Sequence, residues 1–454
     1  MWLRGFFALS KEKIFLRRLL IGAIVLGLLV TSSFARSLAQ TAPSPAASPA
    51  GSPSPSPSPT ASPTPQWSFT GFADVSYTAP LPAGGTFLFT NGTINRVFDG
   101  VTGINTKFPD TTYFVPNNFN INIRKNTSQG LGGQLEESLG SDANVIASYG
   151  AAAGTYTDVT QAFLYYATGP WTLNVGKYET LAGYEVIESP NDSQTSRSIL
   201  FGFAVPFTHT GIRLVYAPTS HFSLTGGVNL GWDQIVSTQG LSTIEGGISW
   251  NPSSVFSFSG DIYSGKEPSV LTPYPTGGTI APPPGSGAAY VYPFGTLVGT
   301  IYGTRTLVDI VGHWNPNSVL NFGVNYDTAG QNNDQSFNGS GALVTNGLGI
   351  PTLGTVHWSG IAGYALWNVN SHFTASGRLE SFSDSNGVRT GIAQTWNEGT
   401  ATLQYVPGAA NWKLRLEFRG DWSNQSSFAR YTSPLGTAVT NNQSIAAEAI
   451  YSWP

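Results

Sequence analysis

The sequence has no cysteine among its 454 residues, and only 10% of them are charged. The missing cysteine excludes a disulfide framework, thiol catalysis and the lipid-bearing cysteine of a lipoprotein. Soluble domains carry about 25% charged residues, so the low charge argues against an ordinary soluble core. From Trp67 onward, no apolar run approaches the ~20 residues that a membrane-spanning helix needs. These shortages leave few classes of protein open.

The residues that are abundant point to another class. Aromatic residues make up 13% of the chain, glycine contributes 53 residues, and the mean hydropathy is −0.05. Neutral hydropathy with many aromatics fits strands that face lipid on one side and water on the other. The five histidines show no metal-ligand spacing, and no nucleophile-elbow motif is present. We therefore expect a β-barrel of the outer membrane, with no metal and no cofactor.

The N-terminal segment has the pattern of an export signal. Five basic residues precede an unbroken apolar stretch of 12 residues at 19–30, and small residues at 37–39 offer a cleavage site. Twelve apolar residues cannot cross about 30 Å of hydrocarbon, so residues 1–39 are predicted to be a cleaved signal peptide. Its removal leaves 15 basic and 24 acidic residues. No basic patch is evident, and nucleic acid is not an expected partner.

Residues 40–65 consist almost entirely of alanine, proline, serine and threonine. A segment of this composition cannot bury a core and is predicted to be an extended periplasmic linker. We favour a simple spacer, and contact with the cell wall through the linker is the alternative. The folded part of the chain is expected to be a barrel over residues 66–454.

Beyond the linker, segments of about ten residues alternate between apolar and polar side chains. Residues 410–423 are a clear example, because Leu414, Leu416 and Phe418 alternate with charged residues. This period of two predicts strands with one lipid-facing side. The predicted strands are 67–77, 118–126, 130–139, 159–168, 171–179, 207–217, 221–232, 240–250, 254–264, 301–314, 318–328, 354–368, 372–383, 395–406, 410–423 and 441–453.

The predicted connections alternate between short turns of two or three residues and mostly long loops. Short turns on one rim and long loops on the other are typical of outer-membrane barrels. The fold is therefore predicted to be all-β, a transmembrane antiparallel up-and-down barrel of about sixteen strands. An even strand number places both termini on the periplasmic side. Closure of the ring satisfies every backbone N–H and C=O group, which an open sheet in lipid could not do.

Charged side chains on these strands are predicted to face the lumen, because Arg or Lys on the lipid face costs about 2–4 kcal/mol at the bilayer midplane. A ladder of both signs can select solutes by charge. The alternative is that the charges pair across strands and stiffen the wall. The candidate pore-lining residues are Arg378, Glu380, Lys413, Arg415, Glu417, Arg419, Asp421, Arg213 and His209.

The loop at 180–206 is the best candidate for a constriction. It is long enough to fold inward, and it mixes polar and aromatic residues. Its candidate residues are Tyr184, Glu185, Asn191 and Arg197. Most other long loops are expected to decorate the surface.

Several short motifs follow one another between about Leu131 and the C-terminus. They are Gly176-Lys177, Gly183-Tyr184-Glu185, Ser196-Arg197-Ser198, Pro206-Phe207-Thr208-His209-Thr210-Gly211, Gly231-Trp232-Asp233, Arg378-Leu379-Glu380, Asp384, Gly387-Val388-Arg389-Thr390-Gly391 and Arg415-Leu416-Glu417-Phe418-Arg419-Gly420-Asp421. As an ordered set over most of the chain, these motifs resemble the OmpL-like β-barrel porin family. The resemblance implies an outer-membrane porin for small hydrophilic solutes and names no substrate.

Three functions stay open at this point. The first is a passive porin, whose partners are outer-membrane lipid and small hydrophilic solutes. The second is a barrel with a plugged lumen and a structural or adhesive role. The third is a barrel hydrolase assembled from residues on different strands, which no motif supports. A homotrimer is usual for general porins, and no residue in the sequence decides the oligomeric state.

Overall fold

The computed structural model describes the barrel and most of its connections. The predicted signal peptide and linker, residues 1–65, lie outside the described residues. The described residues are 66–81, 85–87, 113–148, 156–237, 239–268, 279–280, 290–291, 302–340, 342–345, 352–408, 411–430 and 438–454.

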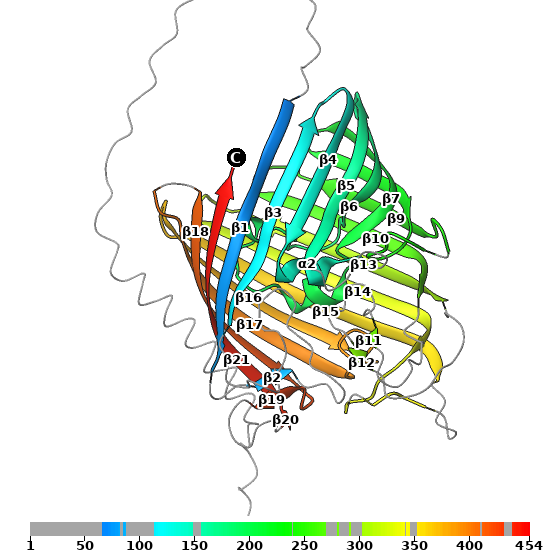
Figure 1. The fold of residues 1–454 in the computed structure, drawn as a ribbon, viewed down its shortest axis with the longest axis vertical. Coiled ribbons are helices and arrows are strands. Elements are labelled where there is room, and N and C mark those ends of the chain that lie inside the picture. Colours follow the sequence, from blue (N-terminus) through cyan, green and yellow to red (C-terminus); the bar gives the residue numbers. More distant parts are fainter. Residues whose placement is uncertain are drawn as a thin grey trace, which may run out of the picture. The chain divides into compact units, whose positions relative to one another are not determined.

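Sixteen antiparallel strands close into one barrel (Figure 1), which confirms the predicted fold and strand number. Each predicted strand corresponds to one observed strand. In chain order they are β1 (Gln66–Pro80), β3 (Tyr113–Asn126), β4 (Gly130–Leu139), β5 (Thr157–Thr168), β6 (Trp171–Glu179), β7 (Thr208–Thr219), β8 (Phe222–Asn229), β9 (Thr243–Trp250), β10 (Phe256–Pro268), β13 (Tyr302–Trp314), β14 (Leu320–Gln335), β15 (Leu353–Asn368), β16 (Phe373–Asp384), β17 (Gln394–Tyr405), β18 (Trp412–Ser423) and β21 (Asn441–Trp453).

The ring closes where β1 pairs with both β3 and β21. Gly71 lies opposite Trp453, and Gln66 lies opposite Asn126. The start of β1, the end of β21 and the short β3–β4 turn therefore share one rim, at the top of Figure 1. The long connections leave from the opposite rim. This arrangement gives every strand two hydrogen-bonded neighbours and leaves no open edge.

Side chains alternate between the outside and the interior along the strands, as β18 illustrates. Leu414, Leu416 and Phe418 are 40%, 56% and 42% exposed on the outer face, whereas Arg415 and Glu417 are 3% and 2% exposed inside. The pleat of a strand produces this alternation. An apolar exterior and a charged interior are what a barrel in lipid requires.

Aromatic side chains collect on the outer face near the rim with the short turns. Trp171 and Tyr216 contact each other there with ring centroids 4.4 Å apart, and Trp412 contacts Tyr451 at 4.9 Å. Such rings suit the interface between lipid and water. Trp232 is an exception, because it is 1% exposed inside the barrel. The chain turns at Gly231, where φ is 121°, and this turn directs the tryptophan inward.

Short elements lie in the long connections. A three-stranded sheet consists of β2 (Gly85–Phe87), β19 (Phe428–Arg430) and β20 (Ala438–Val439), and β11 (Thr279–Ile280) pairs with β12 (Tyr290–Val291). Helix α2 (Ser141–Ile146) follows β4. Among the described residues, no helix combines the length and apolar composition that a membrane crossing needs.

Candidate pore constriction

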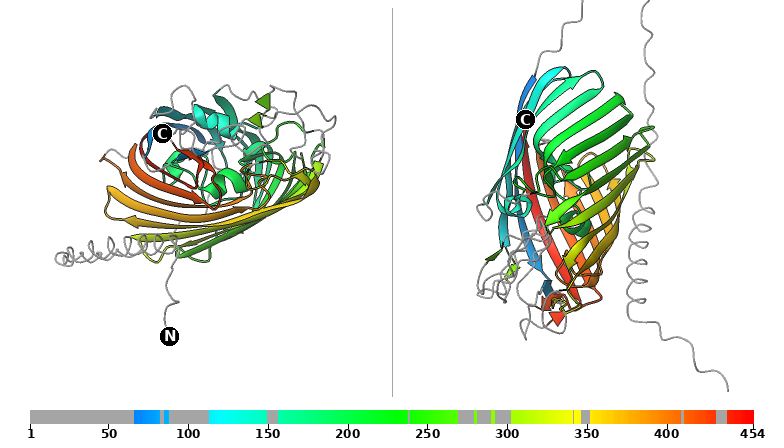
Figure 2. Two further views of the ribbon diagram at one scale, coloured as in Figure 1. Left: turned by 90° about the horizontal axis from the view of Figure 1, so that it is seen from below. Right: turned by 90° about the vertical axis from the view of Figure 1, so that its right-hand side faces the viewer.

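The connection between β6 and β7, residues 180–207, folds into the barrel, and we call it the lumen loop. Seen from below, its helical turns lie within the ring of strands (Figure 2). The loop contains the short 3₁₀ helix η1 (Ser189–Asn191) and the π-helical turn η2 (Leu200–Ala204). Every residue from Gln194 to Phe207 is buried. The lumen loop therefore occupies part of the lumen. The sequence predicted a constriction at this loop.

Apolar packing holds the C-terminal half of the lumen loop. Its run of residues 199–207 is almost entirely apolar, and it joins a cluster of buried aromatic side chains on the barrel wall. Phe203 lies 5.5 Å from Trp396, and Phe201 lies 5.5 Å from Phe207, between ring centroids. The Nε1 of Trp358 donates to the Ala204 carbonyl at 3.0 Å. A hydrophobic core therefore fills this side of the lumen, and a water-filled channel cannot extend over the full width of the barrel.

Carboxylates on the wall accept hydrogen bonds from the backbone of the lumen loop. Glu417 on β18 accepts from the N–H groups of Thr195 and Ser196 at 2.7 and 3.0 Å. Glu380 on β16 accepts from those of Ile199 and Leu200 at 2.6 and 3.1 Å. An irregular loop that is buried must find acceptors for its N–H groups, since each unpaired group costs several kcal/mol in an apolar medium. The two glutamates supply them.

Basic side chains on the same wall donate to the loop carbonyls. Arg415 bonds the carbonyl oxygens of Ser189, Asp192 and Gln194 at 3.0, 2.5 and 3.1 Å. Arg415 also pairs with Glu448 on β21 at 2.9 Å. Hydrogen bonds with an ionised partner are the stronger class. The guanidinium thus fixes the turn around η1 from one side.

Two further residues of β18 complete this set of donors. Lys413 donates to the Pro190 carbonyl at 2.5 Å. Arg419 donates to the Arg197 carbonyl at 2.7 Å, and it pairs with Asp421 at 2.8 Å. The charged side chains of β18 therefore form hydrogen bonds with a loop that lies more than 200 residues earlier in the chain.

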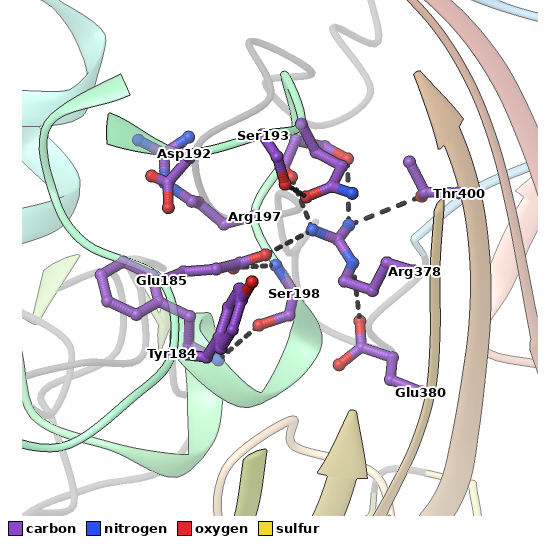
Figure 3. A network of polar contacts seen from close by, with 12 residues as sticks. Tyr184, Glu185, Asp192, Ser193, Arg197, Ser198, Arg378, Glu380 and Thr400 are labelled. Atoms are coloured by element: carbon purple, nitrogen blue, oxygen red, sulfur yellow. Dashed lines mark hydrogen bonds and ion pairs between the residues drawn. The ribbon is translucent and has the colours of Figure 1, made fainter. Parts of the chain in front are cut away.

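Arg378 lies at the centre of the contact between wall and loop (Figure 3). Its guanidinium contacts Glu185 of the lumen loop at 2.6 Å and Glu398 of β17 at 2.9 Å. It also donates to the Ser196 carbonyl at 2.8 Å. Glu185 in turn accepts the N–H of Ser198 at 2.6 Å. Ion pairs and backbone bonds join the loop to two strands at this point.

Arg197 closes the loop upon itself. It donates to the carbonyls of Val186 and Ile187 at 3.0 and 2.9 Å, and it lies 2.9 Å from Asp192. Burial raises the pKa of Asp192 to about 7, and the guanidinium of Arg197 opposes this rise. Arg197 is 2% exposed. It therefore stabilises the loop conformation and does not face an open channel.

The other two predicted loop residues have different surroundings. The Tyr184 ring stacks on Tyr364 at 3.9 Å and on His313 at 4.8 Å, and its backbone N–H donates to Asn325 at 3.1 Å. Burial raises the pKa of Tyr184 to about 12. Asn191 is exposed at the end of η1. Tyr184 thus anchors the start of the lumen loop, whereas the side chain of Asn191 is accessible to water.

The predicted pore-lining residues all lie on the inner face. The lumen loop covers most of them, and Arg378, Glu380, Arg415, Glu417, Arg419 and Asp421 are 1–6% exposed. That they line the path of a solute stays a prediction. Most of these side chains supply the hydrogen-bond acceptors and donors that the buried backbone of the lumen loop requires. On β7, Arg213 forms a bidentate pair with Glu245 at 2.7 and 3.1 Å. His209 is stacked on Tyr263 at 4.5 Å.

Open space remains beside the loop, on the side of β3 and β5–β7. A cavity of about 790 Å³ lies there. A bulge in β5 opposite Glu136 and Glu137 shifts the alternation of its side chains, so the sequence pattern did not indicate the part of the lining that β5 contributes. Both Thr160 and Gln161 face inward as a result. The polar and aromatic side chains that line the cavity include Arg124, Asn126, Gln161, Phe163, Tyr165, Asn174, Tyr178, Glu179 and Arg213.

Helix α2 contributes a second inward contact that the sequence did not indicate. Ile146 is fully buried and joins the apolar cluster of the lumen loop. The hydroxyl groups of Ser148 and Thr208 lie 3.0 Å apart. The prediction had placed this segment in a long surface loop, and its short length concealed the helix.

Asp233, in the β8–β9 connection, holds the end of the lumen loop and gives a pH prediction. It accepts the N–H groups of Phe207 and Thr208 at 2.8 and 2.7 Å. Burial raises its pKa from 3.8 to about 7. A raised pKa favours the protonated form in the folded protein, so this contribution to stability is complete below pH ~3.8 and is lost as the pH rises through 7.

Between pH 6 and pH 8 the wild type should therefore lose roughly 1 kcal/mol more unfolding free energy than Asp233→Asn. The asparagine keeps the acceptor oxygen and does not titrate. Urea unfolding in detergent micelles at both pH values measures the difference. If the unfolding free energies of the two proteins depended equally on pH, the raised pKa of Asp233 would be contradicted.

The geometry is that of known outer-membrane channels. The outer membrane channel DcaP of Acinetobacter baumannii superposes with a TM-score of 0.54 at 12% identity, covering 86% of this chain and 97% of that chain. An anion-selective porin from Comamonas acidovorans gives 0.51 at 9% identity, covering 86% and 100%. OmpT of Vibrio cholerae, in its trimer form, gives 0.50 at 11% identity, covering 86% and 99%. Identities this low show the fold alone.

A search of curated proteins found no match to the sequence. The family model described as "Putative beta-barrel porin-2, OmpL-like" matches residues 90–452. The motifs behind the resemblance lie within this range. Because the match spans most of the chain, the protein belongs to the OmpL-like β-barrel porin family.

Proposed function

We propose that the protein is a porin through which small hydrophilic solutes diffuse passively, along a path that the lumen loop narrows to one side. The observation that carries this proposal is the cavity of about 790 Å³ beside the loop. Amide, hydroxyl and charged groups line much of it. A sixteen-stranded barrel is wide enough for an aqueous channel, so a loop that fills one side leaves room for a narrower path on the other. Family membership favours a channel over an enzyme.

The orientation of the barrel is part of the proposal. We infer that residues 1–39 direct export and are removed, and that residues 40–65 form a linker in the periplasm. Both ends of the barrel lie on the rim with the short turns, and short turns are periplasmic in bacterial barrels. Assembly into a homotrimer stays a prediction, which the trimer form of OmpT supports by analogy.

A second function has one specific observation in its favour. The apolar cluster around the lumen loop, with Ile146 of α2, is a continuous hydrophobic core inside the barrel. Such a core would suit a plugged barrel with a structural or adhesive role. The two functions differ in a simple property, because a plugged barrel conducts no ions.

Single-channel recording in a planar bilayer tests the proposal. The protein, purified after export, should give stable ohmic conductance steps with modest ion selectivity. Heat-dependent migration in gels verifies that the barrel is folded in the sample. A folded barrel that stays silent would rule out the porin and leave the structural role.

Ion selectivity gives a sharper prediction. Arg124 lines the cavity and is exposed, so it places a positive charge beside the proposed path. The substitution Arg124→Gln should shift the reversal potential in a salt gradient toward cation preference. Lys266→Gln is the matched control, because Lys266 is exposed on the outer face of β10. Equal shifts for the two variants would place the ion path elsewhere.

A further inference from the structure

Neutral polar groups form the largest class in the lining of the cavity beside the lumen loop. Amide or hydroxyl side chains belong to Gln66, Asn126, Thr127, Ser128, Gln161, Thr172, Asn174 and Thr180 of this lining. Each of these groups both donates and accepts hydrogen bonds. The hydroxyl groups of a sugar do the same, so the lining suits a solute that carries many hydroxyl groups.

Asn174 on β6 is well placed to bind such a solute. It is half-buried on the inner wall, where it lies opposite Tyr165 of β5 and Arg213 of β7. Within the described part of the chain, its side-chain amide forms no hydrogen bond with another residue. Polar groups in such positions bond to protein, water or ligand, so this amide has a donor and an acceptor available for a solute.

The charged groups of the lining are mostly engaged within the protein. Arg213 forms the bidentate pair with Glu245 and donates to the Glu179 carbonyl at 3.0 Å. The carboxylate of Glu179 accepts from the Gln161 amide at 3.0 Å. Arg124 is exposed, and water and salt screen its charge. Hydrogen bonds to neutral groups are therefore the main polar contacts that the cavity offers.

An aromatic wall borders these polar groups. Phe163 and Tyr165 of β5 both line the cavity, with ring centroids 6.5 Å apart. The Tyr165 hydroxyl accepts the Thr127 N–H at 2.8 Å and donates to the Lys125 carbonyl at 3.0 Å. These two bonds hold the Tyr165 ring in place, so a solute meets a preformed surface and less ordering is needed on binding.

Phe163 is the more accessible ring of this wall, because it is half-buried whereas Tyr165 is buried. Gly176 lies opposite Phe163 on β6, and Gly211 lies opposite Gly176 on β7. Neither glycine adds a side chain beside the ring. A sugar has an apolar face of C–H groups and a polar edge of hydroxyl groups. Its face can therefore contact Phe163 while its edge reaches the neighbouring amides.

We propose that the cavity binds neutral sugars of one or two rings, with Phe163 against the sugar face and Asn174 at its hydroxyl groups. The inference rests on the proposed function, because it names the class of solute that the path carries. The cavity volume of about 790 Å³ lies within the range of about 300–1,000 Å³ for small-molecule sites. A site in a channel must be favourable enough to enter and weak enough to leave, so the binding is expected to be weak.

Block of the ion current by sugars tests the inference on the exported protein in a planar bilayer. Added glucose or maltose should lower the potassium chloride conductance along a saturation curve, because a bound sugar occupies the path of the ions. Polyethylene glycol of similar size is the matched control solute. It has no hydroxyl-bearing ring, and it should lower the conductance only in proportion to the viscosity that it adds.

Two substitutions locate the block in the cavity. Phe163→Leu removes the ring, and Asn174→Leu keeps a similar volume but removes the donor and the acceptor. Each should raise the half-saturating sugar concentration about fivefold or more, because a few anchoring side chains carry most of the binding free energy. Tyr166→Leu is the matched control and should leave this concentration unchanged, because Tyr166 is exposed on the outer face of the same strand.

Three results would overturn the inference and leave the porin in place. The first is a conducting wild type whose current falls only linearly with added sugar. The second is equal block in the wild type and in folded Phe163→Leu and Asn174→Leu, which would place the sugar elsewhere. The third is stronger block by glucosamine than by glucose. Glucosamine carries an ammonium group in place of one hydroxyl, so this result would assign the cavity to cationic solutes near Glu179.

Two further cases are decided by the wild type alone. Should a variant fail to fold, the difference between saturable and linear block in the wild type still tests the sugar site. Silence of the folded wild-type barrel in the bilayer would refute the proposed function, and the inference would be refuted with it.

Discussion

Removal of the lumen loop should raise single-channel conductance several-fold. Replacing residues 186–204 by a short glycine–serine tether takes away both the helical turns and the apolar cluster that they complete. The strands pair with each other and not with the loop, so the barrel should still close. A sixteen-stranded ring without an inserted loop leaves a wide aqueous channel. Planar-bilayer recording measures the change.

The matched control shortens a different connection. Ser340, Ala342 and Val344 are exposed in the β14–β15 connection, and deletion of residues 340–345 should leave the conductance as it is. A loop-deleted barrel that is folded and yet conducts like the wild type would show that ions do not pass beside the lumen loop. The cavity next to β5–β7 would then have no role in conduction.

The strands were predictable because one local property determines them. Apolar and polar side chains alternate wherever one face of a strand meets lipid, and the predicted bounds of β4 and β6 agree with the structure. Agreement fails where the backbone leaves this pattern. The predicted strand 221–232 ends at Asn229, because Gly231 has a positive φ and turns the chain. Sequence periodicity alone does not reveal such a turn.

Lys177 shows both the strength and the limit of the pattern. Its charge interrupts the apolar face formed by Trp171, Leu173 and Val175, and such an interruption indicates a bulge or a strand end. In the structure Gly176 has a φ of 137°, and the backbone turns Lys177 inward, where it pairs with Asp158 at 2.9 Å. The irregularity was therefore visible in the sequence. Its partner was not, because the bulge in β5 that positions Asp158 is a property of two paired strands.

The contacts of the charged side chains on the inner face of β18 could not be predicted from the sequence for a similar reason. The alternation placed Glu417 and Arg415 on the inner face, but their partners lie in a loop more than 200 residues away. Nothing local to β18 indicates that a loop backbone covers it. The motifs of the family resemblance did carry this information in part, since Gly183-Tyr184-Glu185, Ser196-Arg197-Ser198 and Arg378-Leu379-Glu380 meet at one contact.

Loss of the Arg378 guanidinium should have the largest effect of any single substitution in this contact. Glu185, Glu398 and Glu380 lie 2.6, 2.9 and 3.9 Å from it. Removing one partner from a buried ion pair leaves uncompensated charge and costs about 3–5 kcal/mol. Arg378→Met should therefore unfold at a lower temperature. It should also release the lumen loop, because Glu185 then loses its partner on the wall.

Trypsin provides a direct readout of loop release. Arg197 is buried in the folded loop, so the native protein should resist cleavage there, whereas Arg378→Met should be cut after Arg197. The control is Arg124→Met, which removes an exposed charge that has no such network and should change stability by less than about 0.5 kcal/mol. Adding Glu398→Gln to Arg378→Met removes one of the stranded charges and should restore part of the lost stability. A variant Arg378→Met that unfolds like the wild type and resists trypsin at Arg197 would show that the apolar cluster alone keeps the loop in the lumen.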